Sequence, residues 1–264
     1  MRKYVILAVA ALSCLVMASF AQADQTITAS TSPSKLDKKK KKPVTLVVDI
    51  RTADKGTAAG QNQPPDADRT VVDFPKNLSF DPKAVPNCAG TQDQLQNTTT
   101  EAATEICGSK SIVSVGGTVT VDNDSRTVTS PTGAFVTVAS NPAIPGSTQT
   151  KVPVQVTAFN GTDANQLYLH SRPTSLPVTN VLVGKLVKGK GKYGNSLDIT
   201  IPQLLAGGIS DFKTTVKNGK YVQAVCKTTK MPYAATSYYG DGTPTSTATF
   251  DGKCTQKKSK KKKK

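Results

Sequence analysis

The chain has 264 residues, with 34 Lys and Arg against 18 Asp and Glu, which gives a formal net charge of +16. Its single histidine excludes metal sites built from several imidazoles, and the absence of tryptophan leaves only tyrosine for an aromatic sugar-binding surface. A positive charge of this size would suggest a nucleic-acid binder if it were spread over the whole chain.

Residues 1–23 have the three parts of a secretory signal peptide. Arg2 and Lys3 form a cationic start, an apolar run follows, and small residues lead to a cleavage site after Ala23. One alternative is a retained membrane anchor, for which the apolar run is marginal in length. The other is a lipoprotein modified at Cys14, whose preceding residues fit a lipidation box poorly. We therefore expect a secreted, extracellular protein with no transmembrane span in its mature chain.

Lysine is concentrated in two blocks, Lys38 to Lys42 and Lys257 to Lys264. Together with the signal peptide and the rest of residues 24–43, the blocks account for all but three of the net positive charges. Because like charges repel, we expect residues 24–43 to be a disordered Lys-rich linker and residues 257–264 a disordered polylysine tail. The predicted anion-binding residues are Lys38, Lys39, Lys40, Lys41, Lys42, Lys260, Lys261, Lys262, Lys263 and Lys264.

Extended lysine runs bind anionic polymers or membrane surfaces with an affinity that falls as salt rises. The alternative, weighted equally, is that the blocks only keep the protein soluble or act as spacers. Nucleic acid is not the expected partner, because the blocks have no arginine for bidentate contacts and no aromatic residue for base stacking. The sequence does not determine the oligomeric state. It also does not determine whether the protein is released or retained at the cell envelope.

Four cysteines remain after signal cleavage, an even number in an oxidising compartment, so we expect two disulfides. Three pairings are possible. Proximity in sequence favours Cys88 with Cys107 and Cys226 with Cys254. A four-thiolate zinc site is the alternative, but no C-x-x-C pair is present.

Between Val44 and Cys254, Val, Thr and Ile recur with the period of two that is typical of β-strands. The clearest strand is Ile112 to Val121, followed by turn residues and a second strand that would complete a hairpin. Short helices are expected only within Gln92 to Ile106 and Gln203 to Ala206. The predicted strands are Thr45–Arg51, Thr70–Phe74, Ile112–Val121, Arg126–Thr129, Ala134–Ala139, 152–156, 167–169, Val178–Val187, 197–201, 212–216, 222–224, Tyr233–Tyr239 and Thr245–Phe250.

This pattern predicts an all-β fold, a β-sandwich with Greek-key-like returns. Residues 44–256 are long enough for one large domain of packed sheets or two small sandwiches, and we favour one domain with a seam near Pro142 to Thr150. Cys226 shares a strand face with Val222 and Ala224, so it should point into the core.

No catalytic residue is predicted, and we expect neither an enzyme nor a cofactor. His170 alternates with the inward Leu167 and Leu169, which predicts a surface imidazole, and no nucleophile motif accompanies it. Paired carboxylates for glycoside hydrolysis stay open, because they are defined by distance in space. Asp122, Asn123, Asp124 and Asp241 are interpreted as turn residues rather than calcium ligands.

Two further sets of residues bear on ligands and modification. The candidates for a sugar-binding surface are Tyr168, Tyr233, Tyr238 and Tyr239, of which the last two alternate onto opposite faces. N-glycosylation triplets begin at Asn77, Asn97, Asn123 and Asn160.

The segment VVDFPKNLSFDPKAVPNC, which ends at Cys88, precedes a second cysteine and the strand SIVSVGGTVTV. LDITIPQLLAGGISDF, YVQAVC and SYYGDG follow in the second half, before Cys254. This order resembles a group of actinobacterial secreted β-rich proteins of unknown function, over roughly two thirds of the chain. The resemblance implies an exported β-rich domain with local disulfides and implies no activity, and the lysine blocks lie outside it.

The sequence therefore predicts a non-catalytic secreted or cell-surface β-sandwich protein whose lysine blocks associate with anionic envelope polymers. The alternative is an extracellular carbohydrate-binding or carbohydrate-active domain.

Overall fold

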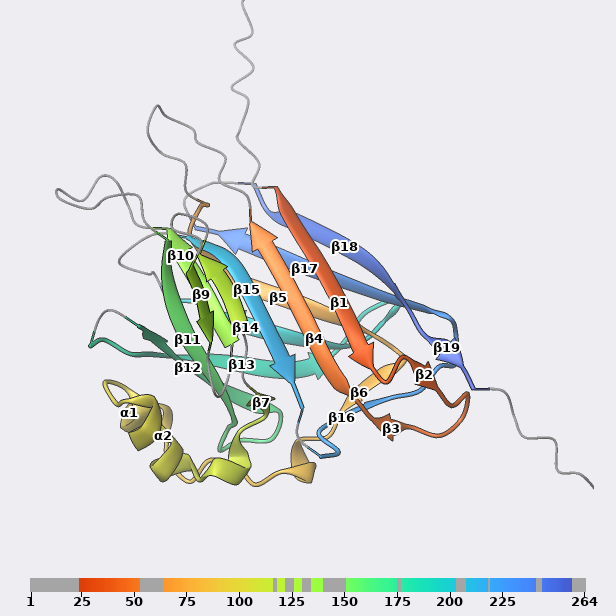
Figure 1. Cartoon of the computed structure of the whole chain (residues 1–264), viewed down its shortest axis with the longest axis horizontal. Coiled ribbons are helices and arrows are strands. Elements are labelled where there is room, and N and C mark those ends of the chain that lie inside the picture. Colours follow the sequence, from red (N-terminus) through yellow and green to blue (C-terminus); the bar gives the residue numbers. More distant parts are fainter. Residues whose placement is uncertain are drawn as a thin grey trace, which may run out of the picture.

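The computed structural model describes residues 24–52, 64–115, 118–121, 126–129, 134–139, 151–174, 177–202, 208–217, 219–240 and 244–257. Strands dominate, as predicted (Figure 1). Several sequence predictions lie outside the described residues: the signal peptide, the seam near Pro142 to Thr150, the Gln203–Ala206 helix, the turns with Asp122–Asp124 and Asp241, and the tail from Lys258 onward.

The largest element is a 12-stranded sheet whose pairings are all antiparallel. Consecutive strands form a meander at its centre, whereas strands far apart in sequence pair toward its ends, as Greek-key returns require. In order across the sheet the strands are β1 (Gln25–Ser32), β4 (Thr45–Thr52), β15 (Ile209–Val216), β10 (Ala134–Ala139), β11 (Lys151–Asn160), β12 (Gln166–Pro173), β13 (Asn180–Lys188), β14 (Tyr193–Thr200), β5 (Ala67–Pro75), β17 (Lys230–Tyr239) and β18 (Ser246–Lys253), with β7 (Ser114–Val115) beside β15.

The sheet curls until its two end strands, β1 and β18, lie close together (Figure 1). Ala29 of β1 and Ala248 of β18 are both buried, and their small side chains permit this approach. Gln25 of β1 also donates from Nε2 to Ser237 Oγ of β17 over 2.8 Å. The curled sheet encloses one main core, which includes Ile27, Leu46, Val48, Ile50, Val72, Phe74, Leu167, Leu169, Ile199 and Tyr233. The prediction of an all-β fold of packed sheets is confirmed.

Three small sheets complete the β structure. One contains β3 (Lys42–Pro43), β16 (Val222–Ala224) and β6 (Leu78–Phe80), and a second pairs β2 (Lys35–Leu36) in parallel with β19 (Thr255–Gln256). The third is the predicted hairpin of β8 (Thr118–Val121) and β9 (Arg126–Thr129).

The prediction of one strand from Ile112 to Val121 is wrong in its first half. The 3-10 helix η2 (Ser109–Ser111) ends next to Ile112, and β7 is only two residues long. Ser114, which the alternation assigned to the polar face, is buried, and its Oγ accepts a hydrogen bond from the N–H of Ala158 over 2.9 Å. A side-chain contact to β11 thus replaces part of the expected strand ladder.

Two short α-helices, α1 (Gln92–Leu95) and α2 (Thr100–Cys107), lie where helices were expected, although α2 ends one residue later than predicted. The 3-10 helices η1 (Pro82–Ala84) and η2 flank them and were not predicted. Thr91 and Gln94 form a capping box on α1, and Thr99 accepts from the N–H of Ala102 at the start of α2. The helices lie over the outer face of β12 and β13 (Figure 1).

The prediction of a disordered linker over residues 24–43 is corrected by the structure. β1, β2 and β3 all lie within this segment, so the folded part begins near Gln25 rather than at Val44. Ile27, Ala29 and Leu36 are buried, and this burial offsets the cost of ordering the chain. The lysine block is short enough to be held as an exposed turn, where water solvates its charges.

Candidate functional site

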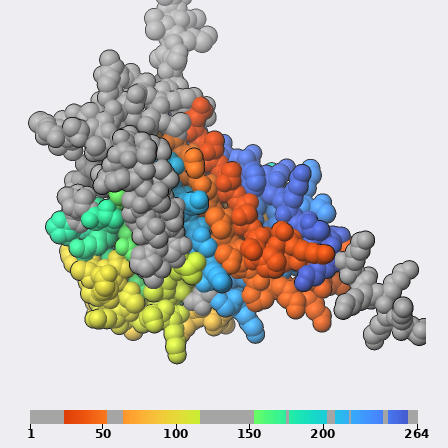
Figure 2. Space-filling model, viewed as in Figure 1, coloured from red at the N-terminus to blue at the C-terminus, as the bar shows by residue number. Residues whose placement is uncertain are grey.

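The pairing of β2 with β19 brings the two lysine blocks together. The N–H of Thr255 donates to Ser34 O over 2.9 Å, and the N–H of Lys257 donates to Leu36 O over 2.8 Å. The C-terminal block therefore starts beside the segment that leads into Lys38–Lys42. Figure 2 shows the red-orange N-terminal segment against the blue C-terminal strands at this end of the molecule. We call the exposed lysines here, Lys35, Lys38–Lys42, Lys227 and Lys257, the lysine pole.

Asp37 organises the turn that carries the first lysine block. Its carboxylate accepts hydrogen bonds from the backbone N–H groups of Lys39 over 2.7 Å and Lys40 over 3.0 Å. These two bonds lower the pKa of Asp37 below its ordinary value, with smaller contributions from the charges of Lys40 and Lys42. The turn is thus held by an ionised carboxylate, and every lysine side chain in it faces solvent.

The disulfide between Cys226 and Cys254 lies under the pole, with a Cα–Cα separation of 5.9 Å. The N–H of Cys226 donates to Asp37 O over 2.8 Å. Gln256 Nε2 donates to Cys226 O over 3.0 Å and to Lys227 O over 3.2 Å. The disulfide and the side chain of Gln256 therefore tie β19 to the segment after β16, and both predicted disulfides are confirmed.

Asn77 supports the same disulfide from below. Its side-chain Nδ2 donates to Thr228 O over 2.8 Å and lies 3.8 Å from Cys254 Sγ. Asn77 is buried, so its amide replaces the water that would otherwise solvate the Thr228 carbonyl.

The ionised Asp37 in the same turn offsets only part of the positive charge of the pole. Within the described ranges, no carboxylate forms an ion pair with a lysine of the pole; the ion pairs there involve Arg51 with Asp49 and Asp211, and Arg69 with Asp198. The pole therefore presents a concentrated positive field to solvent.

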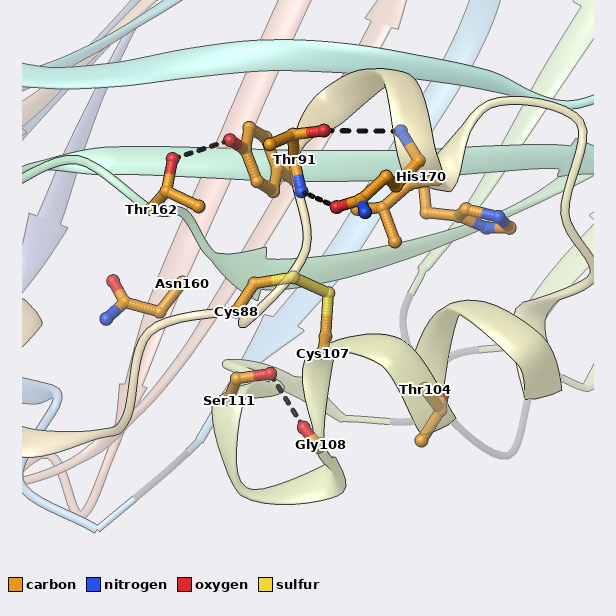
Figure 3. Close-up of a disulfide and its surroundings, with 12 residues drawn as sticks. Cys88, Thr91, Thr104, Cys107, Gly108, Ser111, Asn160, Thr162 and His170 are labelled. Atoms are coloured by element: carbon orange, nitrogen blue, oxygen red, sulfur yellow. Dashed lines mark hydrogen bonds between the residues drawn. A yellow bond between two sulfur atoms is a disulfide. The ribbon is translucent and has the colours of Figure 1, made fainter.

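The first disulfide, Cys88 to Cys107, closes a second and smaller core (Figure 3). α1 and α2 cover the outer face of the large sheet here and bury Leu95, Ala103, Phe159, Tyr168 and Val181 between helix and strand. Because of this cover, β12 is buried on both faces along Leu167–His170. A strand that is buried on both faces cannot be recognised from an alternation of apolar and polar residues.

The prediction of a surface imidazole at His170 is wrong, because His170 is fully buried beneath the helices. Thr98 donates its hydroxyl proton to Leu95 O over 2.6 Å, so the 3.1 Å contact between Thr98 Oγ1 and His170 Nε2 requires the imidazole to donate. Burial lowers the pKa of His170, and the charge of Arg172 adds to this, while hydrogen bonds with the backbone of Thr98 and of His170 itself and the charge of Glu101 oppose it. These contacts give His170 a packing role.

The described carboxylates with a clear pKa shift are poorly suited to act as general acids. Arg69 donates to Asp198 from Nε and Nη2, each over 2.7 Å, and this pair lowers the pKa of Asp198. Glycoside hydrolysis by acid catalysis needs a carboxyl group whose pKa is raised.

Two of the four tyrosines proposed for a sugar-binding surface are buried. Tyr168 and Tyr233 lie in the two cores, and the Tyr168 hydroxyl contacts Thr162 Oγ1 over 2.8 Å. Tyr238 is 39% exposed, with the guanidinium of Arg69 5.0 Å from its ring centre, and the Tyr239 hydroxyl contacts Ser246 Oγ. Tyr238 is thus the most open aromatic ring of the four.

Two of the four glycosylation triplets begin at buried asparagines, whose Nδ2 would have to carry the glycan. Asn77 uses this nitrogen as described above, and Asn160 donates from Nδ2 to Asn87 Oδ1 over 2.8 Å and to Pro82 O over 3.0 Å. Asn97 is exposed, and Asn123 lies outside the described residues. In this fold Asn77 and Asn160 are structural residues.

Among the described residues, no group of three or more His, Cys, Asp or Glu side chains could hold a metal ion. No described helix is both long and apolar enough to cross a membrane.

Only the first of the two sets of lysines that the sequence predicts to bind anions lies within the described residues. Lys38–Lys42 lie in the pole, whereas Lys260–Lys264 lie outside the described residues. Sequence reasoning missed Lys35, Thr255 and Gln256, which form the strand pair beneath the pole, and it missed β1. The alternation of Thr26, Ile27, Thr28 and Ala29 was a usable signal for β1, whereas two-residue strands leave no periodic signal.

No protein-family model, curated protein or solved structure matches the chain. The resemblance to actinobacterial secreted proteins therefore stays a prediction.

Proposed function

We propose that this chain is a secreted, non-catalytic β protein that binds anionic polymers of the cell envelope through the lysine pole. The observation that carries the proposal is the parallel pairing of β2 with β19. It joins two lysine blocks that are separated by more than two hundred residues in the sequence.

Joining the blocks changes what they can bind. An extended polyanion that contacts one block is presented to the other at high effective concentration, so the affinity of the pair exceeds that of either block alone. Lysines within a Debye length of about 8 Å also add their fields at physiological salt. Two isolated tails of the same composition would lack both advantages.

The surroundings of the pole favour a polymer over a membrane. Stable membrane association through a basic patch requires a second, apolar signal. The large hydrophobic side chains exposed in the described part of the chain are Val178, Val187 and Tyr238, and none belongs to the pole.

Two disulfides, an export signal and the absence of a membrane-spanning helix among the described residues are compatible with an extracellular site of action. The exposed lysines at the pole are compatible with retention at the envelope by charge.

The experiment is sedimentation of the disulfide-bonded protein with purified cell walls at low and high salt. Substitution of Lys38–Lys42 by glutamine should release the protein into the supernatant and flatten the dependence on salt. The control variant carries five other exposed lysines as glutamine, namely Lys185, Lys188, Lys190, Lys213 and Lys217, and so has the same net charge. Equal binding by the two variants would mean that overall charge, and not the pole, causes the association.

A further inference from the structure

A shallow groove of about 450 Å³ lies at the junction of β2 and β19. It is lined by Lys35, Thr255, Gln256 and Lys257, so both of its walls carry a lysine and the two walls come from opposite ends of the chain. Lys35 and Thr255 are register partners in the parallel pair, which places the hydroxyl beside the lysine of the other strand.

The donors in this groove match a phosphate group. We infer that the groove is a discrete subsite for one phosphate group of the anionic polymer, an inference that rests on the proposed function. The two ammonium groups and the hydroxyl come from both strands that line the groove, and all three can donate hydrogen bonds to the oxygens of a tetrahedral oxyanion. A planar carboxylate is best bound by the fork of an arginine, and the described residues that line the groove include no arginine.

The groove is more rigid than a solvated lysine run. Its floor is held by the ladder bonds from Thr255 to Ser34 and from Lys257 to Leu36. Gln256 Nε2 is held by two backbone carbonyls, and Cys254 directly before β19 is fixed by its disulfide. A preorganised site loses less conformational entropy on binding than a mobile tail does. The subsite should therefore give saturable binding at a defined place within the diffuse field of the pole.

Leu36, which lies between Lys35 and the turn of the first lysine block, is buried in the core, whereas Lys35 and Lys257 on the groove are exposed. The site therefore fits a group that projects from a linear polymer and stays open to solvent on its other side.

The experiment is a titration of the disulfide-bonded, isotope-labelled protein with inorganic tripolyphosphate, followed by amide NMR shifts. We expect saturable shifts at the amides of Lys35, Leu36 and Thr255–Lys257, and we expect the K35Q/K257Q double variant to weaken binding at this site at least tenfold. The matched control is K188Q/K217Q, which removes the same charge elsewhere and should bind tripolyphosphate as the parent does.

The outcomes separate the subsite from the proposed function. If shifts are confined to Lys38–Lys42 and the tail, or if K35Q/K257Q binds like its control, the subsite is overturned while cell-wall binding through the pole stands. If tripolyphosphate binds in the groove but substitution of Lys38–Lys42 leaves cell-wall binding unchanged, the proposed function fails and the subsite stands. Stronger binding to phosphatidylglycerol vesicles than to tripolyphosphate would overturn the assignment to a polymer.

Discussion

The backbone N–H of Lys257 donates to the carbonyl oxygen of Leu36 over 2.8 Å, across a sequence separation of more than two hundred residues. This bond closes the parallel pair of β2 and β19 and sets the start of one lysine block beside the other. The anion binding proposed for the pole therefore requires contacts that carry no charge, in addition to the lysines themselves.

Removal of the Cys226–Cys254 disulfide by substituting both cysteines with serine should lower the free energy of unfolding by about 3 kcal/mol, because the open loop gains entropy in the unfolded state. It should also weaken binding to polyphosphate, since β19 loses its covalent attachment beside the pole. Denaturant unfolding and a binding titration measure the two effects.

The matched variant replaces Cys88 and Cys107 by serine. It should lose comparable stability, because its loop is of similar size, yet keep its affinity for polyphosphate while folded, because this disulfide closes the helix-covered core. Equal loss of affinity in both variants would contradict a local role for the Cys226–Cys254 disulfide.

Gln256→Ala tests the pole without changing its charge. The substitution removes the two hydrogen bonds from Nε2 to the carbonyls of Cys226 and Lys227, at a cost of about 1 kcal/mol. We expect reduced polyphosphate affinity with an unchanged salt dependence, measured by titration at several salt concentrations. Gln92→Ala is the control, since its Nε2 donates to Val181 O over 2.8 Å beside the helix-covered core and away from the pole; a similar loss of affinity in that variant would refute the prediction.

Asn77→Ala should destabilise the fold by about 1–3 kcal/mol, because the carbonyl of Thr228 loses the donor that the buried Asn77 provides. The appropriate comparison is Asn97→Gly. Asn97 is exposed and has a φ of 60°, a conformation that glycine adopts without strain, so its replacement should change stability by less than about 0.5 kcal/mol. Thermal unfolding of both variants decides the matter, and equal stability of the two would contradict a structural role for Asn77.

His170 should make the fold sensitive to mild acid. Its pKa is lowered in the folded state by burial, so the unfolded chain binds the proton more readily. Stability should therefore be level above the ordinary imidazole pKa of about 6.5 and should fall as the pH drops below it. Thermal unfolding between pH 8 and 5 measures this fall, which His170→Gln should abolish; the same fall in the variant would assign it to another group.

The sequence predicted strands such as β4 and β18 well, because their residues alternate between a buried and a more exposed face. It failed where that alternation carries no information. β12 is covered on both faces around His170, so side chains that point to either face of the sheet are buried there. β1 was not predicted, because the adjacent lysines indicated a disordered linker, although Ile27 and Ala29 alternate with polar residues as a strand requires.

The pairing of the cysteines followed from their proximity in sequence, and the exposure of the lysines followed from the cost of burying charge. Both properties are local, so the chain determined them by itself. The meeting of Lys35 with Lys257 was decided only by the tertiary structure, because two-residue strands such as β2 and β19 have no periodicity of their own. They pair at a place where the curled sheet and the Cys226–Cys254 disulfide hold the two ends of the chain together.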